Sequence, residues 1–371
     1  EMRRLMSFAV LLLFAGTCYA QYALQFGAAV AADEGAVYVG EGRNLLQSGS
    51  VFMYAPDENG AWTQKGALHA SDADNAGHGF GRAFALHEHL MVVGAPLVDA
   101  LYVFERGSDG MWVETARLSN DVAGLGSNIA TNGTHIIATA GGGRGSPSSV
   151  HGWVRDGDEW RSTGELPSSS GEGRTGLGSA LAMAPNLAAV GSPFVLGGKG
   201  MVEMYTFTEG SWVSQGAIEF ASGSEGDSFG SSILMADTHM VVGMPGHDVS
   251  KGAAAIFARN DESGAWEYEL KLEPFDSKGN EQFGSAIAFH GSTIWVSAPG
   301  YGDRNGAVYQ FEINSETMRM GGTHLLQPES LQYRSGFGGA IAVSGSTAVV
   351  GSQGHDNFEG AAFPYSFSDG E

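Results

Sequence analysis

The sequence contains little cysteine, charge or proline, and each scarcity excludes a class of structure. Its single cysteine, Cys18, lies near the N-terminus, so disulfide bonds do not stabilise the rest of the chain. Charged residues make up 16% and hydrophobic residues 43% of the 371 residues. In an average domain about a quarter of the residues are charged. The hydrophobic content of this chain supports a large core and excludes a disordered chain. The 11 prolines and the absence of a Gly-X-Y period exclude collagen.

Basic residues are also scarce, and this limits the partners of the protein. The chain has 19 Lys and Arg against 41 Asp and Glu, which gives a formal net charge of −22. Nucleic acids and anionic membrane surfaces are bound through clusters of basic residues, so we expect neither as a partner. An acidic chain is compatible with solubility, with cation binding or with a basic partner.

The N-terminal segment has the pattern of a secretory signal peptide. Arg3 and Arg4 precede a short apolar run at 8–14, and small residues follow as far as Ala20. We place the cleavage site after Ala20, so that residues 21–371 form the mature domain. The apolar run is too short to cross a bilayer. The sequence therefore predicts a secreted or cell-surface protein without a transmembrane segment.

Glycine, by contrast, is abundant, with 57 residues, and it marks an internal repeat. A two-residue anchor recurs seven times, at intervals of about 52 residues: Phe26-Gly27, Phe80-Gly81, Leu125-Gly126, Leu177-Gly178, Phe229-Gly230, Phe283-Gly284 and Phe337-Gly338. After each anchor come three short β-rich runs, and in most repeats a fourth that contains Trp. Four strands per unit predict an all-β, seven-bladed β-propeller of four-stranded antiparallel blades, starting near 26, 80, 125, 177, 229, 283 and 337.

The anchor residues have expected packing roles in such a ring. The anchor aromatics and the Trp residues should pack between neighbouring blades, because a single blade cannot bury both of its faces. The glycine after each anchor should allow a close backbone approach where the inner strands crowd the axis.

The pairing of FG with VGAP at 93–96 or VGMP at 242–245 resembles the FG-GAP repeat. This repeat is found in the integrin alpha-subunit propeller and in exported bacterial proteins, and the segment 68–104 most resembles the bacterial type. The resemblance extends over about 26–367. It implies a seven-bladed propeller that serves as an extracellular interaction module.

The seventh repeat ends without a Trp-bearing fourth strand, since only four residues follow 364–367. In one interpretation, a strand at 22–25 completes the seventh blade. In the other, which we favour, the chain is part of a longer protein that continues beyond Glu371. We otherwise expect a monomeric domain.

Loop lengths predict which face of the disc is functional. Strand directions alternate within a blade, so the connections between strands 2 and 3 share one face with those between strand 4 and the next strand 1. These connections are longer than the other turns, and binding residues concentrate on such loops. The predicted binding face carries eight aspartates: Asp72, Asp74, Asp99, Asp227, Asp248, Asp276, Asp303 and Asp356.

Calcium is the one cofactor that this face suggests. Calcium prefers several oxygen ligands, and three 2–3 loops share a polar pattern, at 246–252, 300–306 and 354–360. We therefore name five candidate calcium ligands: Asp72, Asp74, Asp248, Asp303 and Asp356. The alternative is that these aspartates form turns by bonding their own backbone. The Asp-x-Asp-x-Asp-Gly loop that integrin-like calcium sites place in the 1–2 turn is missing from this sequence.

Catalytic motifs do not fit their structural context. The match to G-x-S-x-G at 226–230 contains a blade anchor and precedes a strand, whereas the nucleophile elbow precedes a helix. The match to G-x-G-x-x-G at 171–176 also lacks a following helix. We therefore assign no catalytic residue and expect a non-enzymatic module that binds an extracellular protein or glycan. Two alternatives remain: a hydrolase with acidic residues in the axial pocket, and a structural spacer of a larger surface protein.

Overall fold

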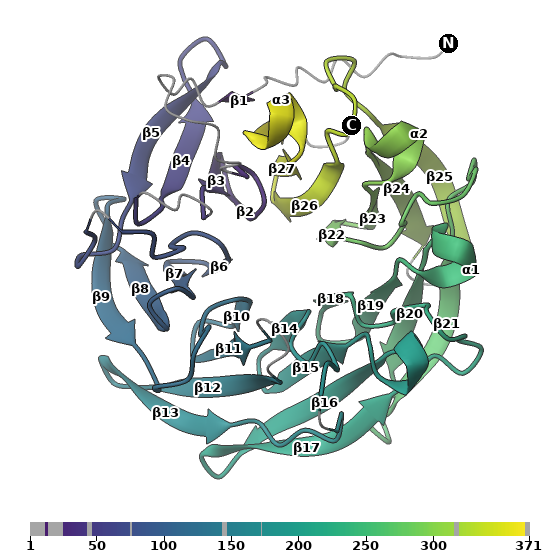
Figure 1. Cartoon of the computed structure of the whole chain (residues 1–371), viewed down its shortest axis with the longest axis horizontal. Coiled ribbons are helices and arrows are strands. Elements are labelled where there is room, and N and C mark those ends of the chain that lie inside the picture. The colour runs from purple at the N-terminus through teal and green to yellow at the C-terminus, as the bar shows by residue number, and fades with distance from the viewer. Residues whose placement is uncertain are drawn as a thin grey trace.

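A computed structural model describes residues 12–13, 25–42, 47–74, 76–142, 147–171, 173–314 and 319–367. Seven four-stranded antiparallel sheets form a ring around a central opening, so the predicted seven-bladed β-propeller is confirmed (Figure 1). Among these residues, no helix is long and apolar enough to span a membrane. The predicted signal peptide at 1–20 lies outside the described residues, except for Leu12 and Leu13.

Each blade is a meander whose strands are counted outward from the axis. The first strands are β2 (Val30–Asp33), β6 (Phe84–His87), β10 (Ile129–Thr131), β14 (Leu181–Ala184), β18 (Ser232–Met235), β22 (Ile287–His290) and β26 (Phe337–Ser344). The second strands are β3 (Ala36–Gly40), β7 (Leu90–Ala95), β11 (His135–Gly141), β15 (Leu187–Ser192), β19 (His239–Met244), β23 (Thr293–Ala298) and β27 (Thr347–Ser352).

The outer strands complete the blades. The third strands are β4 (Val51–Pro56), β8 (Ala100–Arg106), β12 (Ser148–Asp156), β16 (Met201–Thr208), β20 (Ala253–Arg259), β24 (Ala307–Asn314) and β28 (Ala361–Ser366). The fourth strands are β5 (Trp62–Leu68), β9 (Trp112–Leu118), β13 (Glu159–Glu165), β17 (Ser211–Ile218), β21 (Trp266–Leu272), β25 (Arg319–Leu326) and, in blade 7, β1 (Leu12–Leu13). Four short helical segments lie in 2–3 loops: η1 (Leu196–Gly198), α1 (His247–Ser250), α2 (Tyr301–Arg304) and α3 (His355–Phe358).

The core is divided among the junctions between blades. Each of seven hydrophobic clusters in the described part of the chain combines side chains from two neighbouring blades. The second strands are apolar on both faces, and every residue of β7 is buried because neighbouring blades cover both of its sides. Outer strands alternate, as in β9, because one of their faces is solvated.

The anchor residues fasten these junctions, as predicted. The ring of Phe283 is fully buried and packs with side chains of blades 5 and 6. Gly284 adopts φ +91°, and a Cβ atom there would collide with the carbonyl oxygen of Ala253 in blade 5. The close approach that requires glycine is therefore with the neighbouring blade, not at the axis as predicted.

The closure of the ring differs from the predicted closing strand at 22–25. The fourth strand of blade 7 is β1, which pairs antiparallel with Ala361 and Ala362 of β28. Gln25 cannot belong to a fourth strand, because its backbone N–H donates to Phe358 O (3.3 Å) at the junction between blades 7 and 1. Tyr22–Leu24 lie outside the described residues, and the two residues of β1 fall within the predicted signal peptide.

Candidate functional site

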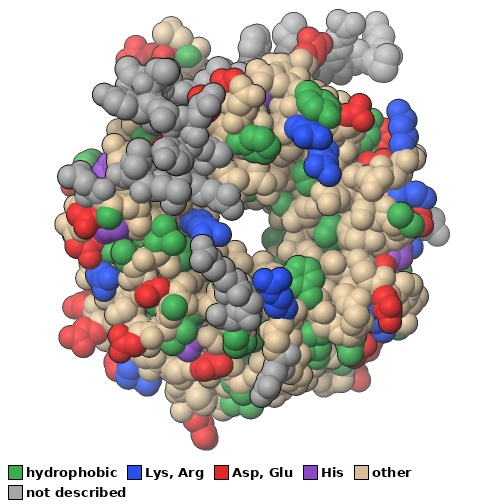
Figure 2. Space-filling view, in the orientation of Figure 1, with side chains coloured by type: hydrophobic (Ala, Val, Ile, Leu, Met, Phe, Trp, Pro, Cys, Tyr) green, Lys and Arg blue, Asp and Glu red, His purple; other side chains and the backbone are tan. Residues whose placement is uncertain are grey.

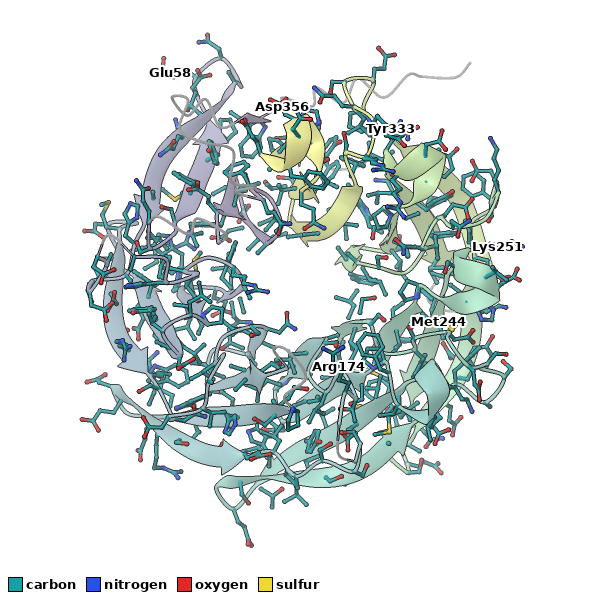
Figure 3. The ribbon with its side chains drawn as sticks, in the orientation of Figure 1. Glu58, Arg174, Met244, Lys251, Tyr333 and Asp356 are labelled. Carbon is teal, nitrogen blue, oxygen red and sulfur yellow. The ribbon has the colours of Figure 1, made fainter. Side chains whose placement is uncertain are left out.

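The 2–3 and 4–1 connections form the face that Figure 1 shows, on which α1, α2 and α3 are visible. Basic side chains lie both beside the central opening and at the outer edge of this face, while acidic side chains lie mainly toward the outer edge (Figure 2). Arg174, on a 4–1 loop, lies beside the opening, and Lys251 lies at the outer edge next to α1 (Figure 3).

The three loops with a shared polar pattern form left-handed turns. In α1, Asp248, Val249 and Ser250 have φ values of 45°, 56° and 63°. Each non-glycine residue in this conformation costs roughly 1–2 kcal/mol. The turn offsets this cost at the junction, because Ser250 O and Lys251 O accept the N–H groups of Gln282 and Phe283, both at 2.9 Å.

The same device recurs at four junctions. The carbonyls of α2 accept from the anchor of blade 7, those of α3 from the anchor of blade 1, and those of η1 from the anchor of blade 5. Main-chain bonds at 2.9 Å join Arg304 O to Gly336 N and Asn305 O to Phe337 N. The three loops with the shared polar pattern therefore have a structural role, because their main-chain carbonyls join blades 5, 6 and 7 to the next blade.

Two of the predicted calcium ligands lie in the 4–1 loop before blade 2. Asp72 accepts a hydrogen bond from the Tyr102 hydroxyl (2.6 Å) and forms an ion pair with Arg117, whose Nε lies 3.1 Å from Asp72 Oδ2. Burial, helped by the bond to Asp72, raises the pKa of Tyr102 to about 12. Asp74 Oδ1 lies 2.9 Å from Nε2 of the buried His78. Both carboxylates thus hold side chains of this loop and of blade 2.

The other three predicted ligands lie on three separate turns. Asp248 pairs with Lys251 at 2.6 Å, and this hydrogen bond to the ammonium lowers the pKa of Asp248. Asp303 and Asp356 are exposed residues of α2 and α3. The described residues include no group of three or more His, Cys, Asp or Glu side chains that could hold a metal. Calcium binding by these five aspartates stays a prediction.

Other aspartates of the predicted binding face act as structural cross-links. Asp227 is buried, and its Oδ2 lies 3.0 Å from His247 Nδ1 of α1. Asp276 accepts hydrogen bonds from the hydroxyls of Tyr301 and Tyr309. Asp99 Oδ1 accepts the Gly124 N–H at 2.6 Å. These contacts favour the interpretation that aspartate on this face mainly shapes loops.

A cleft of about 520 Å³ on this face lies between blades 5 and 6. It is lined by Ser250 of α1, by the 4–1 loop at 278–282, and by 300–304 around α2. At the cleft, Glu281 is 3% exposed and accepts hydrogen bonds from Ser277 Oγ and from two backbone N–H groups. Sequence reasoning missed this cleft, which combines segments of two blades.

One sequence signal points to the buried polar residue at this cleft. The position two residues before the anchor phenylalanine is buried and polar in three successive blades, where it is Asp227, Glu281 and Ser335. A buried polar side chain directly before a packing anchor indicates a loop that is held by specific hydrogen bonds.

A smaller cleft of about 180 Å³ lies at the axial mouth. Its lining residues are Gln25, Ala28, Gly42, Arg82 and Gln353. None of them is acidic, whereas the hydrolase alternative requires carboxylates in the axial pocket.

Exposed apolar side chains concentrate on the same face as the clefts. Of twelve large hydrophobic side chains that are exposed in the described part of the chain, seven lie in 2–3 or 4–1 connections: Leu97, Phe194, Leu196, Val249, Phe275, Tyr333 and Phe358. Only Met111 lies in a turn on the opposite face. Val249, at 85% exposure, is the most exposed of the twelve.

A family model described as the FG-GAP repeat matches residues 62–109 and 266–311. The chain contains FG-GAP repeats. Each matched segment runs from the fourth strand of one blade through the anchor and into the third strand of the next blade. The FG-GAP repeat thus crosses a blade junction, and it includes the anchor that packs there.

Many solved structures share the fold of this FG-GAP-repeat chain, with 556 matching chains. One is a crystal structure from Bacteroides uniformis, described as a candidate 6-phosphogluconolactonase. The two chains are 14% identical with a TM-score of 0.56, over 81% of this chain and 88% of the other. At this identity the likeness shows the fold alone. No curated protein matches the sequence.

Proposed function

We propose that this FG-GAP-repeat propeller is a secreted or cell-surface binding module that holds a macromolecular partner on its 2–3 and 4–1 face. The observation that carries the proposal is the set of seven exposed apolar side chains on the connections of this face, against one on the turns of the opposite face. Apolar groups that a fold leaves exposed together on one surface are typical of interaction sites. The extracellular location rests on the predicted signal peptide.

The attachment of the loops supports this role. Main-chain hydrogen bonds tie the turns at α1, α2 and α3 to the next blade, so the side chains of these turns are displayed from a fixed backbone. A preorganised loop loses less conformational entropy when a partner binds. Val249 and Phe358 are apolar side chains that project from such turns.

The alternatives from the sequence have less support. The Bacteroides uniformis structure is described as a candidate 6-phosphogluconolactonase, but the described lining of the axial cleft in this chain is basic and amide-bearing. A structural spacer would not need exposed apolar side chains concentrated on one face. Binding is therefore the function that the geometry supports best.

The test compares two triple variants of the whole chain. Leu196→Ser, Val249→Ser and Phe358→Ser change the binding face, whereas Met111→Ser, Val213→Ser and Tyr268→Ser change exposed positions elsewhere. The unmodified protein and each variant are immobilised and exposed to the surface extract and the medium of the source cells. The amount of partner that each immobilised protein captures is then measured. Thermal melting confirms that both variants are folded.

We expect the face variant to lose capture by at least about tenfold, the effect of losing roughly 1.4 kcal/mol of binding free energy. The control variant should capture as much as the unmodified protein. The proposal is wrong if the unmodified protein captures nothing, or if both variants capture equally.

A further inference from the structure

We propose that the side-chain amide of Asn132 fastens blade 3 to blade 4, and that this contact excludes an N-linked glycan on the same nitrogen atom. Asn132-Gly133-Thr134 is the one Asn-x-Ser/Thr sequence in the chain, and in a secreted protein this sequence is an acceptor for N-glycosylation. The inference goes beyond the proposed function, because it concerns a turn on the face opposite to the 2–3 and 4–1 connections.

Both hydrogens of the Asn132 amide are used between the blades. Asn132 lies in the turn from β10 to β11, and its Nδ2 donates to Ala184 O (3.1 Å) and to Pro185 O (3.0 Å). These carbonyls lie at the end of β14 and in the turn that follows it in blade 4. An amide nitrogen has two hydrogens, and N-glycosylation replaces one of them with a sugar. A glycan would therefore remove at least one of the two contacts and would need the space in which these carbonyls lie.

The oxygen of the same amide fixes the direction of the nitrogen. Oδ1 accepts hydrogen bonds from the backbone N–H groups of Thr134 (3.1 Å) and His135 (2.8 Å) and from the Thr134 hydroxyl (3.1 Å). Backbone N–H groups can only donate, so the atom that faces them must be the oxygen. The nitrogen then has to face blade 4, and the bonds to Oδ1 would have to break before it could turn toward solvent.

The turn itself is packed between both neighbouring blades. On one side, a Cβ atom at Gly133 would lie only 2.9 Å from Cδ2 of His87, in the turn between β6 and β7 of blade 2. At the end of the turn, His135 is buried, and its ring packs against Phe207 and Trp212 of blade 4 at centroid distances of 4.3 Å and 5.4 Å. The turn therefore has no free direction in which it could shift to make room for a sugar.

Glycosylation of Asn132 and closure of the junction between blades 3 and 4 thus exclude each other. A glycan attached to the unfolded chain would leave the carbonyls of Ala184 and Pro185 without their donor and would hold the two turns apart. Once the junction has closed, both hydrogens of Nδ2 are engaged and the atom is not free to react. The folded protein should therefore carry Asn132 unmodified.

A second Asn-Gly sequence in the chain provides an internal control. Asn59 and Gly60 lie in the turn from β4 to β5, where Asn59 and Ala61 are exposed. Within the described residues, the Asn59 side chain forms no hydrogen bond, and a Cβ atom at Gly60 would meet nothing within 4 Å. Ala61→Thr creates the same Asn-Gly-Thr sequence at this unhindered turn.

The first experiment secretes the whole chain with Ala61→Thr from a eukaryotic host that N-glycosylates, and mass spectrometry measures glycan occupancy at residues 59 and 132. We expect a glycan on Asn59 and none on Asn132 in the secreted, folded protein. Molecules that receive a glycan on Asn132 should be retained in the cell as misfolded protein, and Thr134→Ala should abolish this fraction. The proposal is overturned if the secreted protein carries a glycan on Asn132 and melts at the same temperature as glycan-free protein from a bacterial host.

The second experiment uses only glycan-free protein and tests the contact itself. Asn132→Asp and Asn59→Asp each add one negative charge, but only Asn132→Asp directs a carboxylate at two carbonyl oxygens. We expect the melting temperature to fall by about 5 °C in Asn132→Asp and by no more than about 1 °C in Asn59→Asp. If Asn132→Asp does not fold, Asn132→Ala removes the amide without adding a charge and should lower the melting temperature by about 3 °C. Melting temperatures equal to that of Asn59→Asp would overturn the proposal.

The proposed function is tested separately, because partner capture uses glycan-free protein and the opposite face of the disc. If Asn132→Asp melts like the control while the face variants still lose capture, this inference fails and the proposed function survives. If the unmodified protein captures nothing while Asn132→Asp is destabilised as expected, the proposed function fails and the contact between blades 3 and 4 stands.

Discussion

Two kinds of junction between the blades of this propeller can be compared, and the difference explains where its sequence is regular. At four junctions two carbonyls at the end of a left-handed turn accept the N–H groups of the next anchor phenylalanine and of the residue before it. A parallel bridge forms at each of them: Gly200 to Phe229, Gly252 to Phe283, Gly306 to Phe337, and Gly360 to Phe26. At the junctions that lead into blades 3 and 4 the anchors are Leu125 and Leu177. The described residues show no such bridge there.

Side chains replace the main-chain links at the leucine junctions. Asp99 Oδ1 accepts the Gly124 N–H at 2.6 Å before the anchor of blade 3. Before blade 4, Thr139 Oγ1 and Asn128 Nδ2 both donate to Gly178 O at 2.8 Å. Main-chain links depend on backbone conformation, whereas side-chain links depend on residue identity. The turn-linked junctions should therefore tolerate side-chain changes in the turn but not changes that disturb its backbone or its anchor.

The largest expected effect comes from an anchor of a turn-linked junction. Phe283→Ala removes a fully buried ring that packs edge-on against Tyr309 and Phe311. We expect the free energy of unfolding to fall by about 3–5 kcal/mol. Leu125→Ala, at a leucine junction, should cost about 2–3 kcal/mol, because less apolar surface is lost.

Urea denaturation measures both losses, with Phe289→Ala as the control because this ring is 49% exposed. If Phe283→Ala costs no more than this control, the anchor does not fasten the junction. If it costs no more than Leu125→Ala, the two kinds of junction are energetically the same.

The next largest effect tests the close backbone approach within a turn-linked junction. Gly306 has φ +91°. In Gly306→Ala, the new Cβ would collide with backbone atoms of Phe337. The collision and the left-handed backbone conformation together should lower the free energy of unfolding of Gly306→Ala by about 2–3 kcal/mol. Gly216→Ala is the matched control, since Gly216 has φ +96° in open space.

The control should cost about 1 kcal/mol, because it carries the conformational cost without the collision. Equal losses in the two variants, measured by thermal unfolding, would show that the bridge between Gly306 and Phe337 does not restrict the junction.

The comparison of junctions also shows what the sequence could predict. The anchors and the apolar second strands recur with a regular spacing, because each junction needs the same buried groups, and they were sufficient to predict the blade number. The left-handed turns were not predicted, since Val249 is a poor candidate for positive φ, although aspartate is among the residues that adopt it. The sequence pattern of the turn left two interpretations open, turn-forming aspartates and a candidate calcium site, and neither specified this backbone.

The sequence analysis did not predict the cleft between blades 5 and 6 or the strand that closes blade 7, for a different reason. The cleft arises where 278–282 meets 300–304, and no local pattern encodes this meeting. The fourth strand of blade 7 comes from the opposite end of the sequence, at Leu12–Leu13, where an apolar run has the pattern of a signal peptide. Both features depend on contacts between segments that are distant in the sequence.

A smaller effect should appear when the pH is lowered, at the junction between blades 7 and 1. His355 of α3 is 1% exposed, and burial lowers its pKa from the ordinary value. Its unfolded pKa is about 6.5. Between that value and the lower folded pKa, the unfolded chain binds a proton that the folded chain does not. Stability is therefore full above about pH 6.5 and falls as the pH decreases.

Denaturation at several pH values between about 7 and 5 measures this slope. We expect His355→Gln to reduce the loss of stability over this pH range, because the glutamine does not titrate. Some slope should remain, because burial also lowers the pKa of His135 and of His151. An unchanged slope in His355→Gln would contradict the prediction.

The smallest effect has the opposite sign and tests the turn itself. Val249 is β-branched, 85% exposed and held at φ 56° in α1, a conformation that asparagine adopts more readily. Val249→Asn should therefore stabilise the chain by about 0.5–1 kcal/mol without changing any buried contact. Val113→Asn, at a 58% exposed position of strand β9, should destabilise the chain slightly, because asparagine disfavours strands.

If both substitutions destabilise to the same degree in urea, the turn is not strained, and its retention of valine needs no functional reason. If only Val249→Asn stabilises, the junction keeps a residue that costs stability at the tip of the proposed binding face, which is the position where binding would favour an exposed apolar side chain.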